Sequence, residues 1–237
     1  MIGNNPNLFC VDVDDPVWAT ANWTYIDPWT NFSTNCATSF GCTDSLALNY
    51  NPLATIDDGS CTYQMTYVPD DNFEQALINL GYDNVLDDSV LTASISSVTN
   101  LNIESQNIAD LTGVEDFTDL TDLDCSDNQL TSLDLSNNMA LTSLHCEGNQ
   151  LSILDLSHNM ALTSLDCYAN QLTSLDVSQN TALINLQCQS NQLTTLDVSN
   201  NTALTYLYCN VNQLTILDVS QNTVLLVLDC SANQLTT

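Results

Sequence analysis

From Leu120 onward the sequence repeats with a strict 21-residue period, through five full repeats and a truncated sixth. Each repeat has leucine at positions 1 and 4 and cysteine at position 6. Alternating apolar residues in so short a segment predict a strand with one buried face, and coils stacked about 4.8 Å apart align equivalent residues. The period therefore predicts a solenoid. The copies begin at Leu120, Leu141, Leu162, Leu183, Leu204 and Leu225.

Each buried position then becomes a column along the array. The expected leucine column is Leu123, Leu144, Leu165, Leu186, Leu207 and Leu228. Asparagine amides can satisfy turn backbone groups of their own and the next coil, in a column of Asn128, Asn149, Asn170, Asn191, Asn212 and Asn233.

The cysteine column is expected to pack as buried, unreactive thiols, because in-register parallel strands do not bring sulfur atoms into bridging geometry. Metal binding or a disulfide ladder is the alternative. The column is Cys125, Cys146, Cys167, Cys188, Cys209 and Cys230.

The motif LxxLxCxxNxL, followed by the half-repeat LxxLDLSxN, resembles the 21-residue leucine-rich repeats of bacterial proteins, of the secreted surface type in Bacteroidota. The resemblance implies a repeat solenoid of mainly β structure, with short parallel strands and a small helical N-terminal cap. We expect the array to span residues 98–237, with an irregular first repeat that has Gln106 in place of the column asparagine.

The segment DDNFEQALINLGY predicts a short helix in a cap that spans residues 65–97. Asp71 and Glu74 have the spacing of a capping box, and Gly81 is placed to end the helix. The apolar residues expected on one face are Phe73, Leu77 and Leu80. Such a cap would shield the core of the first coil from water.

Residues 1–36 resemble the last coil and C-terminal cap of a preceding array, and residues 37–64 read as a loop-rich linker. The sequence stops within a repeat, at NQLTT. We therefore expect either a fragment of a longer tandem protein or a subunit whose open C-terminal coil docks residues 1–10 of the next copy. Docking of this kind predicts an extracellular filament.

The chain has 29 acidic residues and no Lys or Arg. It therefore lacks the basic surface that nucleic acid or anionic lipid would require, and we exclude both as partners. No apolar run approaches the length of a membrane span, which argues against membrane insertion. Such an excess of negative charge attracts cations.

Four cysteines lie outside the repeats, and residue types alone allow three pairings. The cap resemblance implies that Cys10 pairs with Cys36 and Cys42 with Cys61. Such disulfides indicate an oxidising compartment, so we expect a secreted, extracellular or cell-surface protein.

The segment GCTDSLALNYNPLATIDDGSC is similar to a short motif between modules of secreted Bacteroidota proteins and to thrombospondin type 3 calcium loops. The resemblance implies a calcium site, although the acids are sparse for a DxDxDG repeat. A solvated linker closed by a disulfide is the alternative. The expected ligands are Asp44, Asn49, Asn51, Asp57 and Asp58.

A column of aspartates in the second half-repeats either accepts turn hydrogen bonds from the serines two residues later or binds cations. The pairs are Asp134 and Ser136, Asp155 and Ser157, Asp176 and Ser178, Asp197 and Ser199, and Asp218 and Ser220.

Outward strand positions vary while the framework does not, which is typical of a binding face, although drift between repeats could produce the same variation. One row is Asp124, His145, Asp166, Gln187, Tyr208 and Asp229, and the other is Ser126, Glu147, Tyr168, Gln189, Asn210 and Ser231. Tyr168, Tyr206 and Tyr208 form an aromatic spot suited to a sugar or a peptide.

Catalytic chemistry has little support in the sequence. There are two histidines, and we expect His145 on an outward strand position and His158 in a turn, both solvated and neither with a nucleophile at fixed spacing. The sequence therefore predicts a non-catalytic protein that binds an extracellular protein or glycan, with the filament as the alternative.

Overall fold

The computed structural model describes residues 8, 10–28, 30–34 and 39–236. The chain divides into two compact units, Met1–Gln64 and Met65–Thr237, and each is considered by itself below.

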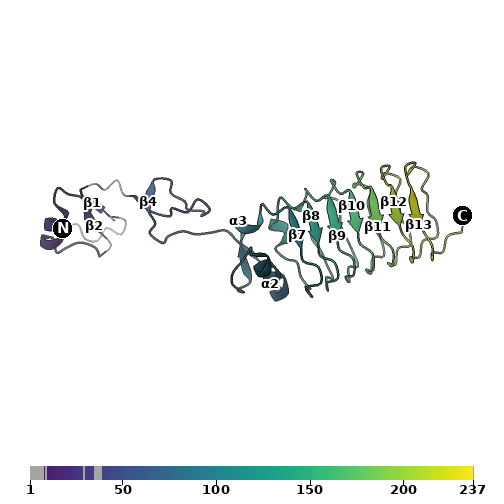
Figure 1. The fold of residues 1–237 in the computed structure, drawn as a ribbon, viewed down its shortest axis with the longest axis horizontal. Helices are drawn as coiled ribbons and strands as arrows, with labels where there is room; N and C mark the ends of the chain where they lie inside the picture. Colours follow the sequence, from purple (N-terminus) through teal and green to yellow (C-terminus); the bar gives the residue numbers. More distant parts are fainter. Residues whose placement is uncertain (1–7, 9, 29, 35–38, 237) are drawn as a thin grey trace. The chain divides into compact units, whose positions relative to one another are not determined.

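Seven strands of the second unit form one parallel sheet in which each strand pairs with the next along the chain (Figure 1). Leu101 pairs with Leu123 across the irregular first repeat, and Leu123 pairs with Leu144 at the regular step that then continues. The predicted solenoid of leucine-rich repeats is confirmed. The strands are β7 (Asn100–Asn102), β8 (Asp122–Asp124), β9 (Ser143–His145), β10 (Ser164–Asp166), β11 (Asn185–Gln187), β12 (Tyr206–Tyr208) and β13 (Val227–Asp229).

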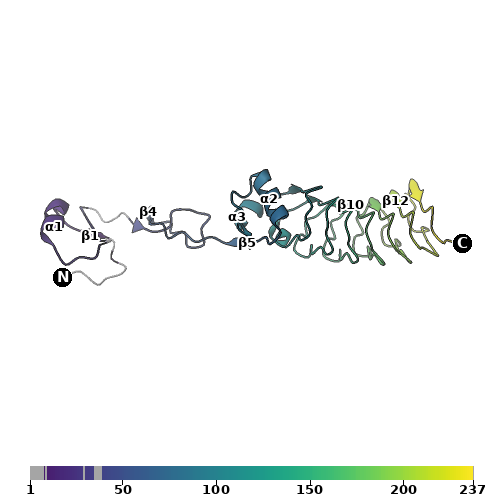
Figure 2. The ribbon, with the colours of Figure 1, turned by 90° about the horizontal axis from the view of Figure 1, so that it is seen from below.

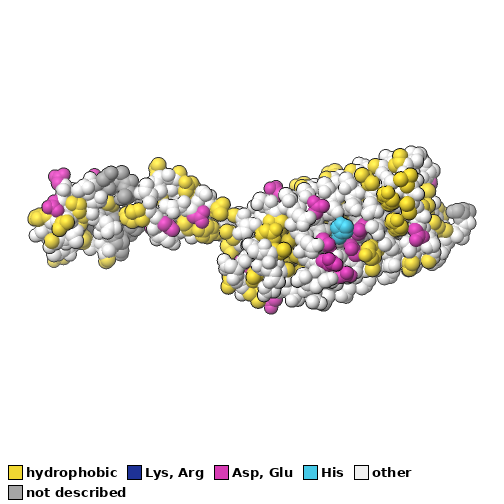
Figure 3. All heavy atoms as spheres, in the orientation of Figure 1, with side chains coloured by type: hydrophobic (Ala, Val, Ile, Leu, Met, Phe, Trp, Pro, Cys, Tyr) yellow, Lys and Arg dark blue, Asp and Glu magenta, His cyan; other side chains and the backbone are white. Residues whose placement is uncertain are grey.

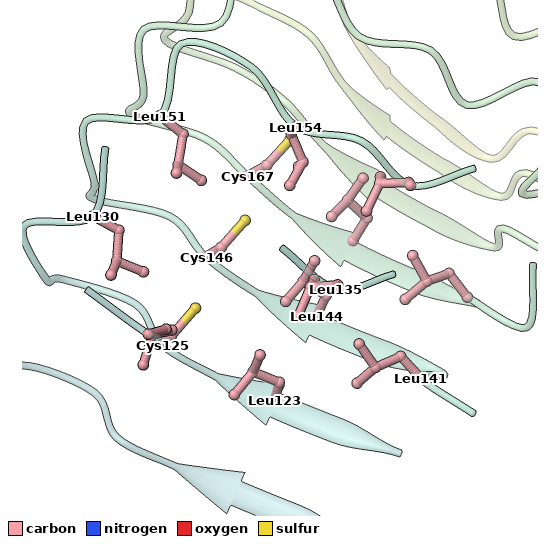
Figure 4. Close-up of a cluster of buried hydrophobic side chains, with 14 of the residues drawn as sticks. Leu123, Cys125, Leu130, Leu135, Leu141, Leu144, Cys146, Leu151, Leu154 and Cys167 are labelled. Atoms are coloured by element: carbon pink, nitrogen blue, oxygen red, sulfur yellow. The ribbon is translucent and has the colours of Figure 1, made fainter. Parts of the chain in front are cut away.

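The core is one continuous apolar cluster that runs from the cap through the stacked coils, and Figure 4 shows a part of it in the coils. The column leucines from Leu123 to Leu207 are at most 1% exposed, as predicted. Leu228 is 40% exposed and Cys230 is partly exposed, so their predicted burial is wrong. Both lie in the coil of β13, the end strand of the sheet, over which no further coil of the described chain stacks.

The predicted asparagine column joins neighbouring coils. Asn149 donates from Nδ2 to the carbonyls of Cys146 in its own coil at 3.1 Å and Cys125 in the preceding coil at 3.0 Å. Its Oδ1 accepts from the Leu130 N–H at 2.9 Å. The column thus satisfies turn backbone groups as expected, and the second coil that each amide contacts is the preceding one.

A second asparagine column, not anticipated from the sequence, lies in the half-repeats. Asn159 donates from Nδ2 to the carbonyls of Leu135 and Asn138 of the preceding coil, both at 3.0 Å. The Oδ1 atoms of this column are buried and accept no hydrogen bond from the described residues. Its members are Asn138, Asn159, Asn180, Asn201 and Asn222.

The residue that precedes each asparagine of the predicted column has a left-handed backbone conformation. The φ of Val211 is 55°, and the equivalent Ala169 has a φ of 52°. Among the array residues at this position only Gly148 is glycine, so most coils place a side chain where glycine is favoured.

The N-terminal end of the array is covered by a cap that contains α2 (Asp71–Leu80) and the short α3 (Thr92–Ile95) (Figure 2). The other elements of this part are the antiparallel pair β5 (Met65–Tyr67) and β6 (Ser89–Leu91) and the 3-10 helix η1 (Val114–Asp116). Phe73 stacks on Phe117, with ring centroids 6.4 Å apart.

The predicted capping box of α2 is wrong by one residue. Asp70 is the N-cap, and its Oδ1 accepts from the N–H groups of Asn72 and Phe73. Its Oδ2 accepts from Ala109 and Asp110, which ties the helix to the first coil.

Glu74 is fully buried and accepts backbone hydrogen bonds from residues 87–89 instead of capping the helix. Phe73 and Leu77 are buried as expected, whereas Leu80, in the last turn of α2, is 45% exposed. Gly81 ends the helix with a φ of 84°, as predicted.

In the first unit, the parallel strands β1 (Cys10–Asp12) and β2 (Asn31–Ser33) pair Cys10 with Asn31. That offset equals the step at which Leu123 pairs with Leu144 in the array. The helix α1 (Pro16–Asn22) connects them, with Asp15 as N-cap. β3 (Ser39–Phe40) and β4 (Ala54–Ile56) form a second short pair. Across the described part of the chain, no helix is both long and apolar enough to cross a bilayer.

Candidate functional site

The outward side chains of β8 to β13, with the residues two positions after each strand, form a surface that we call the strand face. Cross-strand pairing aligns the first predicted row, so that Asp124, His145, Asp166, Gln187, Tyr208 and Asp229 are successive neighbours. Because the strands are in register, chemically unlike side chains lie side by side at the spacing of strands in a sheet.

The most polar part of the strand face surrounds His145. Figure 3 shows a histidine ringed by acidic side chains at this position. His145 Nδ1 lies 3.3 Å from Asp166 Oδ2. Asp166 also accepts from Asn185 and Gln187, each at 3.2 Å, and is only 8% exposed.

These contacts change the interpretation of both residues. His145 lies on an outward strand position with its side chain 38% exposed, and its pairing with Asp166 was not anticipated from the sequence. Asp166 is covered by its neighbours on the flanking strands and contributes little open surface. His158 lies exposed in a turn, as predicted.

Glu147 extends this group from the second row. One ligand atom each of His145, Glu147 and Asp166 lie within 4.8 Å of one another. Burial raises the pKa of the Glu147 carboxyl, and burial likewise raises the pKa of Asp166. Glu147 Oε2 is shielded from solvent and accepts no hydrogen bond from the described residues.

Ser143 places a hydroxyl beside the same imidazole, with Oγ 3.2 Å from His145 Nε2. The expectation that neither histidine has a neighbouring nucleophile is therefore wrong. The contacts run from serine to histidine to aspartate, as in the hydrogen-bonded triad of a hydrolase. Such a site also needs N–H groups that donate to an oxyanion. The N–H groups of Ser143 and Cys146 are bonded to the carbonyls of Thr121 and Asp166.

Over β11 to β13 the strand face and its border expose aromatic and aliphatic side chains among polar ones, and Figure 3 shows hydrophobic side chains gathered there. Tyr206 is 40% exposed, and Tyr208 lies two residues further along the same strand. Ile184 and Leu226, which directly precede β11 and β13, are 46% and 75% exposed. Tyr168 is partly buried, near Glu147, and burial raises the pKa of its hydroxyl.

The repeat cysteines from Cys125 to Cys209 offer no reactive group on this face. Cys125 to Cys209 are buried free thiols, as expected, and Figure 4 shows three of them one above another. Burial raises the pKa of Cys209 to about 12 and likewise raises the pKa of the other buried thiols. Thiolate chemistry is therefore suppressed.

The aspartate column of the half-repeats caps turns, which confirms the first of its two interpretations. Asp176 Oδ1, for example, accepts from the Ser178 N–H at 2.9 Å, and this bond lowers the pKa of Asp176. The other four pairs have the same bond.

The loop of residues 42–61 is closed by a disulfide between Cys42 and Cys61. The predicted pairing of Cys10 with Cys36 lies outside the described residues.

The proposed calcium ligands hold the turns of this loop. Asp44 accepts from Leu46 N–H and from Tyr63 Oη, and both bonds lower the pKa of Asp44. Asn49 accepts from the Thr62 N–H and donates to the Ser60 carbonyl. The oxygens of Asn51, Asp57 and Asp58 each accept from the N–H two residues later.

Comparison with known proteins yields bacterial leucine-rich-repeat proteins, whereas no protein-family model matches the chain. Internalin J of Listeria monocytogenes serotype 4b (strain F2365) is 43% identical over 72 residues. That match covers 30% of this chain and 8% of internalin J, so the chain spans a small part of the relative.

Two solved structures share the fold. A leucine-rich-repeat protein of Leptospira interrogans has a TM-score of 0.56 at 28% identity, over 60% of this chain and 39% of that one. Internalin C2 of Listeria monocytogenes has a TM-score of 0.57 at 21% identity, over 74% of this chain and 92% of that one. The chain therefore has the leucine-rich-repeat fold and is similar to bacterial proteins with that fold.

Proposed function

We propose that this chain is an extracellular, non-catalytic binding module whose strand face binds an extracellular protein or a glycan. The observation that carries the proposal is the division of this face into an acidic part around His145 and an apolar part around Tyr206. Exposed aromatic side chains supply large contact areas at small entropic cost, and adjacent charges supply orientation.

The two parts favour a protein partner over a glycan. Ile184 and Leu226 are also exposed, in backbone segments that hydrogen-bond to Tyr206 and to Thr205. Sugars stack on aromatic rings, whereas a patch that also contains exposed isoleucine and leucine suits apolar side chains. The acidic part complements basic groups of the partner and would steer its approach.

The test compares matched variants on opposite halves of the repeat. The double substitution Tyr206→Ser and Tyr208→Ser removes the aromatic part, whereas Ile153→Ser removes a half-repeat side chain that is 75% exposed. Both proteins are screened against extracellular protein and glycan arrays. Hits lost in the tyrosine variant and retained in the isoleucine variant support the proposal, and hits that survive both changes contradict it.

Non-catalysis is tested at Ser143. Because the neighbouring N–H groups are engaged in the sheet, we expect no covalent labelling by a fluorophosphonate. Labelling that disappears in Ser143→Ala would establish a hydrolase instead.

A filament remains the second candidate. Leu228 is exposed within β13, the end strand of the sheet, whereas Leu207, the equivalent residue of the preceding coil, is buried, so a further coil of this or another chain would cover Leu228. Leu226, just before the same strand, is also exposed. Electron micrographs of the purified chain should show threads if copies dock there, and Leu226→Asp should abolish them. Monomers in both samples would leave binding as the only role.

Calcium binding by residues 42–61 is proposed on the resemblance and on the disulfide that gathers the loop oxygens. The disulfide also supports secretion into an oxidising compartment. Calorimetry with calcium in physiological salt tests the site. Heat lost in a variant with Asp57→Asn and Asp58→Asn supports it, and unchanged heat overturns it.

A further inference from the structure

We propose that His145, Glu147 and Asp166 form a binding site for a divalent transition-metal ion of the zinc type. The site belongs to the strand face but does not depend on the proposed partner binding. It rests on the geometry of the three side chains, on an unsatisfied oxygen and on the absence of any basic residue that could neutralise the carboxylates.

The distances fit a metal ion. Ligand atoms of tetrahedral zinc lie roughly 3.3 Å apart, because each is about 2.0–2.1 Å from the ion. His145 Nδ1 and Asp166 Oδ2 are already separated by 3.3 Å. The third ligand atom, on Glu147, completes a set within 4.8 Å, so ion binding requires the Glu147 carboxylate to move closer to the other two ligand atoms.

The unsatisfied oxygen belongs to Glu147. Its Oε2 is shielded from water and has no hydrogen-bond donor among the described residues. A shielded carboxylate oxygen without a partner is destabilising, because it has lost its hydration and gained no bond in return. A cation between Glu147 and His145 removes that penalty.

The charge balance points to the same conclusion. Glu147 interacts electrostatically with Asp124, with Asp166 and with the imidazole of His145. In most proteins lysine or arginine would neutralise such a group, but this chain has neither. A divalent ion supplies the missing positive charge, and neighbouring polar side chains already orient the ligands.

Ser143 acts as a positioning residue for the histidine. When its Oγ accepts a hydrogen bond from His145 Nε2–H, the imidazole presents its Nδ1 lone pair toward Asp166. In this tautomer Nδ1 is unprotonated and can ligate an ion, whereas in the other tautomer Nδ1–H donates to Asp166. One nitrogen and two carboxylate oxygens select borderline ions such as Zn²⁺ over Ca²⁺.

Three protein ligands leave a coordination position open to water or to a donor atom of a partner. The ion would therefore present a positive point within an acidic surface. This arrangement changes which groups the strand face can bind.

The test is zinc titration calorimetry of the full chain in physiological salt with excess calcium, which occupies weak acidic sites. We expect one zinc ion per chain, with affinity reduced at least tenfold in His145→Gln and in Asp166→Asn. The matched control is His158→Gln, which removes the other histidine and should retain the wild-type affinity. Wild-type affinity in His145→Gln, or no zinc binding at all, overturns the proposal.

Cobalt(II) identifies the ligands independently. Its visible spectrum should show nitrogen and oxygen ligation without a thiolate charge-transfer band. A thiolate band would assign the ion to the repeat cysteines and refute the site. The Tyr206→Ser and Tyr208→Ser protein should bind zinc normally, so loss of partner binding and loss of metal binding are distinguishable.

Discussion

Glu74 Oε1 accepts a hydrogen bond from the backbone N–H of Asp87 at 2.9 Å, from inside the cap. The same carboxylate accepts from Asp88 and Ser89, so one side chain holds the loop between α2 and β6. Glu74→Ala leaves three N–H groups unsatisfied and should lower the free energy of unfolding by about 3 kcal/mol.

Urea unfolding measures this loss. Glu74→Gln keeps one acceptor oxygen and should cost about half as much. The charge-matched control is Glu104→Ala, an exposed position, which should change stability by less than about 0.5 kcal/mol. Equal effects of Glu74→Ala and Glu104→Ala would show that the loop does not depend on Glu74.

The cysteine column should resist thiol reagents in the native protein. Burial raises the thiol pKa values, so neither access nor thiolate is available from Cys125 to Cys209. Cys230 is partly exposed and should react first. Mass spectrometry after brief alkylation should find one modified repeat cysteine, and none in Cys230→Ser. Labelling of all six at the denatured rate contradicts the stacked core.

The interior around Cys167 is apolar. The polarity of the residue at this position should therefore affect stability more than its volume does. Cys167→Ser places a hydroxyl in the core and should destabilise by about 2 kcal/mol, whereas Cys167→Ala should cost about 1 kcal/mol. Chemical denaturation of the two variants compares them. A serine variant as stable as the alanine variant would indicate water in the core.

Replacing Val211 with glycine should stabilise the protein. Its φ of 55° is strained for a β-branched residue, and its side chain is 50% exposed, so little packing is lost. Val211→Gly should raise the free energy of unfolding by about 1 kcal/mol, while Val211→Ala, which keeps a Cβ, should gain less. A destabilised glycine variant would show that the valine side chain stabilises its turn by packing.

Stability should depend on pH through Asp166 and Glu147. Burial raises their folded pKa values above the ordinary 3.8 for Asp and 4.5 for Glu, so protonation favours the folded state. Their contribution to the free energy of unfolding is fully present below those ordinary pKa values. It is lost as the pH rises through the folded pKa values. Acidification from neutral pH should therefore stabilise the metal-free protein.

The turn aspartates act in the opposite sense. Hydrogen bonds lower the pKa of Asp176, so its contribution to stability is present above pH 3.8 and is lost as pH falls through the lower folded pKa.

The role of Asp166 is tested by urea unfolding of the wild type and of Asp166→Asn, with a chelator, from neutral pH down to acidic pH. An identical pH profile for both proteins would contradict the assigned role of Asp166.

Periodicity identified much of the fold because a stacked solenoid is nearly one-dimensional. Once Leu123 and Leu144 occupy the same position of adjacent coils, the positions of all other equivalent residues are fixed as well. These include the asparagines and the turn aspartates. The same reasoning failed at Leu228 and Cys230, because burial depends on a neighbouring coil rather than on the residue itself. It also missed the Asn159 column, although these asparagines recur with the same 21-residue period.

The cap and the His145 cluster required the tertiary structure. Spacing suggested that Glu74 caps α2, but the fold turns this side chain inward to residues 87–89. The letters of one repeat show only that His145 points outward.

The sequence by itself thus determined the coil, its period and the residues that face its interior, since these follow from local alternation of apolar side chains. Only the tertiary structure decided that Ser143, His145, Glu147 and Asp166 meet, and that Asp166 is covered while Tyr206 is exposed. The physical reason is that contacts between coils join side chains from different repeats, whose rotamers and neighbours no single repeat specifies.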